Sequence, residues 1–106
     1  MECIFCNIVE RKAPADITHE DERCLVFRDI HPEAPVHLLV IPKKHVSSLL
    51  ELEDTELGGT LLLCAKAAAR KAGLTGYRVR INVGKQGGQI IDHLHLHVLG
   101  EPAKSN

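Results

Sequence analysis

Alternation of apolar and polar residues marks two stretches of the chain as strands. Residues 77–83, YRVRINV, and residues 93–100, HLHLHVLG, alternate in this way, and successive side chains of a strand point to opposite faces. Two shorter apolar runs, residues 23–29 and 36–42, also predict strands. The second run ends at Pro42, because proline has no N–H to donate to a ladder.

Apolar residues at helical spacing predict two helices. Residues 3–12, CIFCNIVERK, form a short amphipathic segment that ends before Pro14. Residues 56–73 are rich in alanine and leucine, carry basic residues near their end and finish at a glycine. These are the signals of a long helix and its stop. Asp54 or Thr55 can cap it.

The remaining segments connect these elements. Residues 31–35, HPEAP, and the glycine-rich residues 84–89, GKQGGQ, predict loops, and residues 43–52 could form a further short helix. Strands and helices do not alternate regularly, so the order predicts an α+β fold with an antiparallel sheet of four or more strands. No repeat or linker divides the chain, which predicts a single domain over residues 1–106.

Composition limits the partners that we expect. The chain has 13 Lys and Arg against 14 Asp and Glu, a formal net charge of −1, whereas nucleic-acid-binding domains usually carry a basic patch. It has no apolar stretch long enough to span a membrane and no start typical of a signal peptide. We therefore expect neither a nucleic-acid nor a membrane partner, and a cytoplasmic location. There, the 4 cysteines predict thiols or metal ligands rather than disulfides.

Three histidines, His93, His95 and His97, share one face of the last predicted strand. They could fill polar sheet positions, converge on a zinc ion, or include a nucleophile for an activated phosphorus centre, since neutral imidazole is nucleophilic near pH 7. The glycine-rich residues 84–89 favour the third interpretation, because glycine lets backbone N–H groups approach phosphate oxygens closely. Together the two features suggest phosphoryl or nucleotidyl chemistry.

The chain resembles the histidine triad (HIT) family, whose signature His-φ-His-φ-His-φ-φ, with φ hydrophobic, matches residues 93–99. Residues 27–45, FRDIHPEAPVHLLVIPKKH, and residues 76–89, GYRVRINVGKQGGQ, resemble its nucleotide-binding branch. The resemblance implies a five-stranded antiparallel sheet with two main helices. It also implies a homodimer in which the two sheets join into one.

The resemblance further implies a mechanism. By motif position, His95 would attack the α-phosphorus of a nucleotide, giving a covalent nucleotidyl-imidazole that water then hydrolyses. Imidazole suits this role because it is both a good nucleophile and a good leaving group. His97 would hydrogen-bond the phosphate or the leaving group and help to protonate a departing amine, and His37 would orient the strand histidines.

Substrate contacts are implied in the same way. The implied residues are Phe5, Ile8, Phe27 and Ile30 for a purine, Asp29 for the ribose hydroxyls, and Asn82, Gly88 and Gln89 for phosphate and ribose. The apolar members could equally pack in the core, and Asp29 could be a turn residue. The chain departs from the family pattern at Ile90, where many members carry a serine that touches phosphate or leaving group. It also ends at GEPAKSN, without the longer tail that shapes substrate choice in animal members.

Cys3 and Cys6 form a Cys-x-x-Cys pair, which is a weak signal by itself. Redox use would need a β-α-β setting, and zinc needs two further ligands. The chain resembles bacterial family members that bind zinc through this pair, a histidine after IPK and the first triad histidine, which here are His45 and His93. Such a closed four-ligand site would be structural. The alternative is two free thiols on a small helix.

Taken together with the histidine row and the glycine-rich loop, the resemblance implies a homodimeric hydrolase of purine nucleoside phosphoramidates and related nucleotidyl conjugates, releasing AMP or GMP. The alternatives are a dinucleoside polyphosphate hydrolase, a nucleotide-binding or scaffold protein with little turnover, and a hydrolase with catalytic zinc. Of the other cysteines and histidines, we expect Cys24 and Cys64 to lie in the core and His19 and His31 to lie at the surface.

Overall fold

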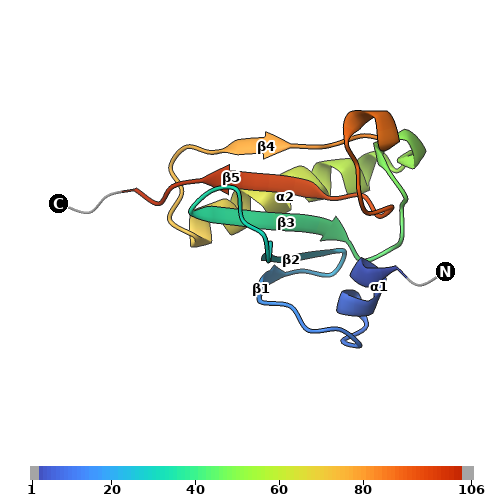
Figure 1. Cartoon of the computed structure of the whole chain (residues 1–106), viewed down its shortest axis with the longest axis horizontal. Coiled ribbons are helices and arrows are strands. Elements are labelled where there is room, and N and C mark those ends of the chain that lie inside the picture. Colours follow the sequence, from blue (N-terminus) through green and yellow to red (C-terminus); the bar gives the residue numbers. More distant parts are fainter. Residues whose placement is uncertain (1–2, 104–106) are drawn as a thin grey trace.

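Five antiparallel strands form one sheet in the order β1-β2-β3-β5-β4, with the long helix α2 behind it and the short helix α1 near its lower edge (Figure 1). The computed structural model describes residues 3–103. In chain order the elements are α1 (Ile4–Val9), β1 (Ile17–Glu20), β2 (Cys24–Arg28), β3 (Val36–Pro42), η1 (Leu49–Glu51), α2 (Thr55–Lys71), β4 (Arg78–Arg80), η2 (Lys85–Gly87) and β5 (Leu96–Gly100). The predicted α+β fold, with a five-stranded antiparallel sheet and two main helices, is confirmed.

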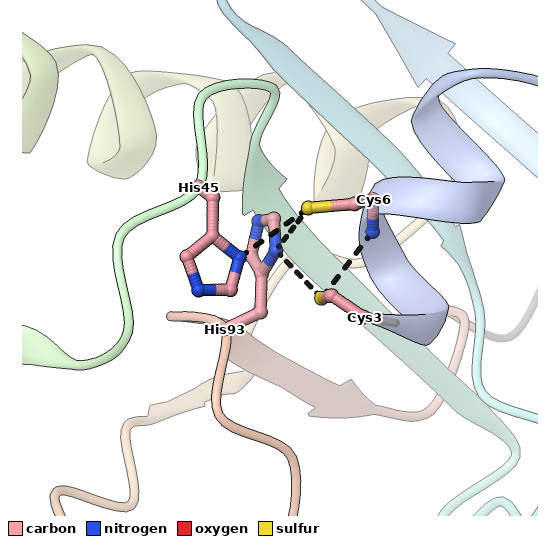
Figure 2. A group of neighbouring side chains, drawn as sticks. All are labelled: Cys3, Cys6, His45 and His93. Carbon is pink, nitrogen blue, oxygen red and sulfur yellow. Dashed lines mark hydrogen bonds between the residues drawn. The ribbon is translucent and has the colours of Figure 1, made fainter. Parts of the chain in front are cut away.

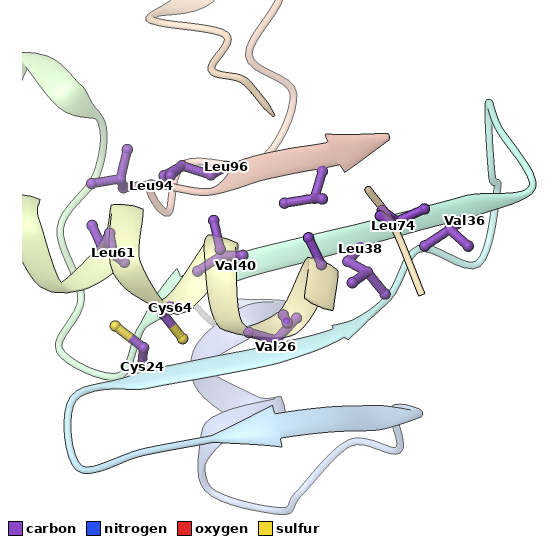
Figure 3. Close-up of a cluster of buried hydrophobic side chains, with 14 of the residues drawn as sticks. Cys24, Val26, Val36, Leu38, Val40, Leu61, Cys64, Leu74, Leu94 and Leu96 are labelled. Atoms are coloured by element: carbon purple, nitrogen blue, oxygen red, sulfur yellow. The ribbon is translucent and has the colours of Figure 1, made fainter. Parts of the chain in front are cut away.

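Helix α2 packs on one face of the sheet through a stripe of buried leucine and alanine side chains. Asp54 caps it by accepting the N–H of Leu57 at 3.0 Å, and Gly73, with φ +80°, follows its end. Cys24 of β2 and Cys64 of α2 belong to this core and are 0 % and 3 % exposed, as predicted (Figure 3). Within residues 3–103, no helix combines the length and apolar character needed to cross a membrane.

The opposite face carries a smaller apolar cluster beneath α1. Its buried members are Phe5, Ile8, Leu25, Phe27, Leu39 and Ile41. Along β3 these residues alternate with the α2-facing Leu38 and Val40, so this central strand is buried on both faces. The histidines of the last strand point to this second face, and the face is therefore both apolar and rich in imidazole.

The last strand is shorter than its alternation predicted, because regular pairing begins at Leu96 rather than at His93. In the register of β3 and β5 the residue opposite Leu94 would be Pro42, which has no N–H to donate. Leu94 instead donates its own N–H to the carbonyl oxygen of Val46 at 2.7 Å. The alternation of faces continues through this irregular stretch, since Leu94 is buried in the α2 core.

Other boundaries also differ from the predictions. Only Arg78–Arg80 of residues 77–83 pairs as a strand, and residues 43–52 contain a single 3₁₀ turn rather than a helix. The pattern missed β1, which has four residues and is only half-buried. His31 is exposed as predicted, whereas His19 is half-buried on β1 and its Nδ1 is shielded from solvent, so its prediction as a surface residue is wrong.

Candidate active site and metal centre

A cavity of about 720 Å³ lies over the histidine-bearing face of the sheet. Its apolar part is lined by Phe5, Ile8, Phe27, Ile30 and Leu39, and its polar part by Asp29, Glu33, Arg80, Asn82, Gly88, His95 and His97. The structure thus brings together residues from α1, four strands and two loops. Of the predicted catalytic and substrate-binding residues, His37 and Gln89 do not line this cavity.

His95 lies just before β5, 8 % exposed, with the Phe5 ring at a centroid distance of 5.3 Å. Its Nδ1 donates a hydrogen bond to the carbonyl oxygen of His93 at 2.7 Å, because a carbonyl oxygen can only accept. The neutral ring therefore has its lone pair on Nε2. Burial lowers the pKa of His95 below its usual value. At pH 7 this histidine is neutral, and Nε2 is available as a nucleophile.

His37 lies behind the cavity and fixes the tautomer of His97. Its Nδ1 accepts the backbone N–H of Glu33 at 3.0 Å, so its proton is on Nε2, which donates to Nδ1 of His97 at 2.8 Å. His97 consequently carries its own proton on Nε2. Burial, followed by the neighbouring His95 and Arg80, lowers the pKa of His97 to about 4. His97 is thus a neutral hydrogen-bond donor at the cavity.

The apolar part of the cavity, called the apolar slot below, is lined by aromatic and aliphatic side chains. Phe5 and Phe27 meet edge to face, with centroids 5.4 Å apart. Both are buried, so they serve the core and the cavity wall at the same time. Ile30 lines the rim and is 84 % exposed. Next to it, Asp29 is oriented by the N–H of His31, which its Oδ1 accepts at 2.8 Å.

The glycine-rich loop forms the far wall of the cavity. Gly84 and Gly88 adopt φ of +69° and +85°, a region in which a side chain would be strained. A Cβ on Gly88 would lie 3.4 Å from Nδ2 of Asn82. Asn82 in turn donates from Nδ2 to the carbonyl oxygen of Gly87 at 2.9 Å. The loop is therefore held close to Asn82, and of its residues Gly88 lines the cavity.

Gln89 is buried, and its side-chain amide holds this loop in place through hydrogen bonds. Its Oε1 accepts the N–H of Gly84 at 2.9 Å, and its Nε2 donates to the carbonyl oxygens of Ser47 and Ile91 at 2.7 and 2.9 Å. All these hydrogen bonds are internal. The structure does not bring this side chain to the cavity, where the sequence placed a contact to phosphate or ribose.

Arg80 and Glu33 line the cavity beside His97, and the sequence analysis did not single them out. They form a two-point ion pair, with Nη1–Oε1 and Nη2–Oε2 distances of 3.1 and 2.8 Å. Arg80 lies directly opposite His97 in the register of β4 and β5, so both side chains are on one face. Finding this neighbour requires the strand register, which a single sequence does not contain.

Cys3, Cys6, His45 and His93 meet at the start of α1 (Figure 2), and their four ligand atoms lie within 4.8 Å of one another. Cys3 is the N-cap of α1, and its Sγ accepts the N–H of Cys6 at 3.4 Å. Residues three apart at a helix start face the same side, which is why both thiols point at the two imidazoles. The structure therefore brings together all four residues of the predicted zinc site.

The geometry of this cluster fits a tetrahedral metal ion. Nδ1 of His93 lies 3.3 and 3.6 Å from the sulfurs of Cys3 and Cys6, and Nδ1 of His45 lies 3.3 Å from the sulfur of Cys6. With Zn–S of about 2.3 Å and Zn–N of about 2.0 Å, the S–N edge of a tetrahedron is about 3.5 Å. His93 donates from Nε2 to the carbonyl oxygen of Pro42 at 2.8 Å, which leaves Nδ1 unprotonated to bind a metal.

Known proteins resemble this chain over nearly its whole length. Residues 10–104 match the family model of the HIT domain. An uncharacterised HIT-like protein of Synechococcus elongatus is 54 % identical over 102 residues, which cover 93 % of this chain and 90 % of that protein. The crystal structure of a HIT family hydrolase from Legionella pneumophila superposes with a TM-score of 0.91 and 44 % identity, over 98 % of this chain and 96 % of the other. A histidine triad protein from Clostridium difficile gives a TM-score of 0.91 and 39 % identity, over 100 % and 96 % of the two chains.

Proposed function

This chain belongs to the HIT family, and on that premise we propose that it hydrolyses purine nucleoside phosphoramidates and related nucleotidyl conjugates, releasing AMP or GMP. The observation that carries the proposal is that His95 lines a cavity with one apolar and one hydrogen-bonding end, while the hydrogen bond of its Nδ1 leaves Nε2 unprotonated. The similar Legionella pneumophila protein is described as a hydrolase, which agrees with this class of reaction.

In the first step Nε2 of His95 attacks the α-phosphorus and the bond from phosphorus to the leaving nitrogen breaks. The positive charge that develops on the ring is stabilised by the hydrogen bond from Nδ1 to the carbonyl oxygen of His93. Nε2–H of His97, directed by its hydrogen bond with His37, donates a hydrogen bond to the departing nitrogen, and the amine takes its proton from water in the site, which the second step restores. The product is a nucleotidyl group on His95.

In the second step water attacks the phosphorus and His95 leaves, giving AMP or GMP. The attacking water returns one proton to the site, so each cycle consumes one water and one substrate. The backbone N–H groups near Gly88 and the guanidinium of Arg80 are the donors that would stabilise negative charge on the phosphoryl oxygens. The buried side chain of Gln89 supports that loop rather than touching the phosphate.

The apolar slot is assigned to the purine base. Phe5 and Phe27 supply aromatic edges, and the exposed Ile30 would be covered by a bound base. Asp29 stands at the junction of the slot and the histidines, where its carboxylate can accept both hydroxyls of a ribose. The order base, ribose, phosphate then follows the sheet from β2 toward β4.

Zinc is the metal that we propose for the cluster of Cys3, Cys6, His45 and His93, because two sulfurs and two imidazole nitrogens in tetrahedral reach are its preferred ligands. All four positions are supplied by protein, so the ion would be structural. It would fasten α1, which carries Phe5 and Ile8, to the segment that carries His95. The chemistry itself needs no metal in this proposal.

A homodimer in the cytoplasm completes the proposal. Strand β4 lies at the edge of the sheet, and Tyr77 and Val79 on this edge are exposed. On α2, Leu62 and Leu63 are 57 % and 67 % exposed, and exposed apolar patches mark interaction surfaces. Pairing of β4 with its copy would bury these residues and join the two sheets.

The first experiment is mass spectrometry of the full chain, quenched rapidly during turnover of an adenosine 5′-phosphoramidate. We expect an AMP-sized adduct on the peptide that contains His95, and neither adduct nor turnover in the His95→Ala protein. Substrate consumption with no adduct would contradict covalent catalysis and favour a hydrolase with catalytic metal. No consumption, together with nucleotide binding, would make the chain a binding protein. Faster turnover of a dinucleoside polyphosphate would show that the proposed substrate class is wrong, while the proposed covalent mechanism would still hold.

A further inference from the structure

A second group of metal-binding side chains lies on the α2 face of the sheet, away from the cavity. A ring nitrogen of His19, a carboxylate oxygen of Asp21 and Sγ of Cys64 lie within 4.8 Å of one another. His19 is opposite Val26 in the register of β1 and β2, and Val26 belongs to the α2 core. The group therefore joins the first hairpin of the chain to the middle of α2.

The ligand atoms of this group are held in place by the fold. Oδ1 of Asp21 accepts the N–H groups of Arg23 and Cys24 at 2.9 and 2.8 Å, which fixes the carboxylate in the turn between β1 and β2. Cys64 is buried in the stripe of α2 that packs on the sheet. The three side chains can therefore bind one ion with little movement.

Nδ1 of His19 is the observation that calls for a ligand. It is buried, with less than 1 Å² accessible to solvent, and has no hydrogen-bond partner among residues 3–103. Buried nitrogens of this kind are almost always paired. A metal ion bound by this imidazole, beside a thiol and a carboxylate, would supply the missing partner.

The donor set selects the class of ion. Nitrogen, sulfur and one carboxylate oxygen suit Zn²⁺ and similar transition metals, whereas Mg²⁺ and Ca²⁺ prefer oxygen alone. A divalent ion bound by one thiolate, one carboxylate and a neutral imidazole has no net charge, which suits a site beside an apolar core. Cys24 lies next to Cys64 in the α2 core (Figure 3) but does not belong to the group, so the protein supplies three ligands to the ion.

We propose that His19, Asp21 and Cys64 form a second metal site for a thiophilic divalent cation such as Zn²⁺. The site is separate from the cluster of Cys3, Cys6, His45 and His93 and lies on the other face of the sheet. Its ion ties the turn between β1 and β2 to α2.

The test uses the full chain with Cys3→Ser and Cys6→Ser, which removes both thiols of the first cluster. After treatment with a chelator, Zn²⁺ is titrated by equilibrium dialysis and Co²⁺ by absorption spectroscopy. We expect about one ion per chain, sulfur-to-cobalt charge-transfer absorption, and a rise in the unfolding temperature when Zn²⁺ is added. Adding His19→Phe or Cys64→Val, both apolar replacements of comparable shape, should remove the ion and the absorption.

A third variant keeps the test valid if those replacements disturb folding, as circular dichroism would show. Asp21→Asn retains an amide oxygen for the N–H groups of Arg23 and Cys24 but loses the charge, and should weaken Zn²⁺ binding by about tenfold or more. The proposal is overturned if the protein lacking Cys3 and Cys6 binds no Zn²⁺ or Co²⁺. It is also overturned if a bound ion is unaffected by the changes at His19, Asp21 and Cys64, since that ion then lies elsewhere.

Discussion

Along residues 93–98 the two faces of the sheet receive side chains that are equally buried but chemically opposite. Leu94, Leu96 and Val98 face α2 and are at most 2 % exposed, whereas His93, His95 and His97 face α1 and the cavity and are at most 9 % exposed. Burial by itself stabilises a leucine by about 1.5–3 kcal/mol, but it destabilises a polar ring unless the ring is hydrogen-bonded. Side chains on the α2 face therefore need only to fill space, whereas every imidazole ring on the histidine face needs a hydrogen-bond partner.

Each histidine meets this need with one nitrogen and keeps the other for a different purpose. His93 uses Nε2 on the carbonyl of Pro42 and directs Nδ1 to the two thiols. His95 uses Nδ1 on a backbone carbonyl, and His97 uses Nδ1 on His37. The comparison teaches that the fold assigns the tautomers: the hydrogen bonds that make burial tolerable also determine which nitrogen is left for the proposed contact with metal, phosphorus or leaving group.

Removing His95 gives the largest expected effect, and one confined to the histidine face. His95→Ala should lower kcat/KM for an adenosine phosphoramidate by about 10⁴-fold or more, because the nucleophile is lost. The free energy of unfolding should change far less than the activity. Steady-state kinetics and urea denaturation of the same preparation measure the two quantities. Activity within tenfold of the parent protein would remove His95 from the mechanism.

Truncation of Leu96, the residue after His95, should have the reverse effect, with a large loss of stability and little change in turnover. Leu96→Ala leaves a cavity under α2 and should reduce the free energy of unfolding by about 2–5 kcal/mol. The turnover number per folded molecule should stay within about twofold, since Leu96 points away from the cavity. Urea denaturation and kinetics at low temperature provide both values. A large loss of turnover in fully folded protein would show that the two faces are not independent.

Acid should destabilise the histidine face selectively. The pKa of His97 is lowered to about 4, whereas an unfolded histidine titrates near 6.5. Between these values the unfolded chain binds a proton that the folded chain excludes, so the stabilisation is complete above pH 6.5 and is lost as pH falls toward 4. Burial lowers the pKa of His93 and His95 in the same direction.

Urea denaturation from pH 4 to 8 measures this slope. We expect His97→Gln to flatten the profile between pH 6.5 and 4, because it removes the histidine whose pKa the fold lowers to about 4 while keeping a polar side chain. Leu96→Ala should lower the whole profile without changing its slope. An unchanged slope in His97→Gln would mean that other groups cause the acid sensitivity.

A substitution at Arg80 tests a neighbour of His97 that only the structure reveals. Arg80→Met should lower kcat/KM by about 10- to 100-fold, because a cation next to the phosphoryl oxygens is lost. It should also raise the pKa of His97, which Arg80 now lowers. Arg78→Met on the same strand is the matched control: it removes the same charge from a residue outside the cavity lining. Equal effects of the two changes would indicate a general influence of charge.

The difference between the α2 face and the histidine face also explains which features could be predicted from the sequence. Periodicity was sufficient for the α2 face, since aliphatic residues at helical and strand spacing have one way to be buried, and it correctly placed Cys24 and Cys64 there. On the histidine face the residue types and the family motif pointed to His95 and to the metal cluster. They did not give the register that sets Arg80 opposite His97, nor the internal hydrogen bonds that occupy Gln89. Such partners are far apart in the chain and depend on the folded geometry.

Ile90 should give the smallest effect, in the direction of higher activity. It lines the rim of the cavity and is 92 % exposed, so replacing it removes little buried surface, and the free energy of unfolding should change by less than about 0.5 kcal/mol. Ile90→Ser adds a hydroxyl that can donate to a phosphoryl oxygen. One such hydrogen bond contributes about 0.5–1.5 kcal/mol, which corresponds to a rise in kcat/KM of roughly 2- to 12-fold. Ile90→Ala separates the hydroxyl from the mere loss of bulk: an equal rise in both variants would mean that the isoleucine only obstructs the rim, and no rise in either would remove this position from the reaction.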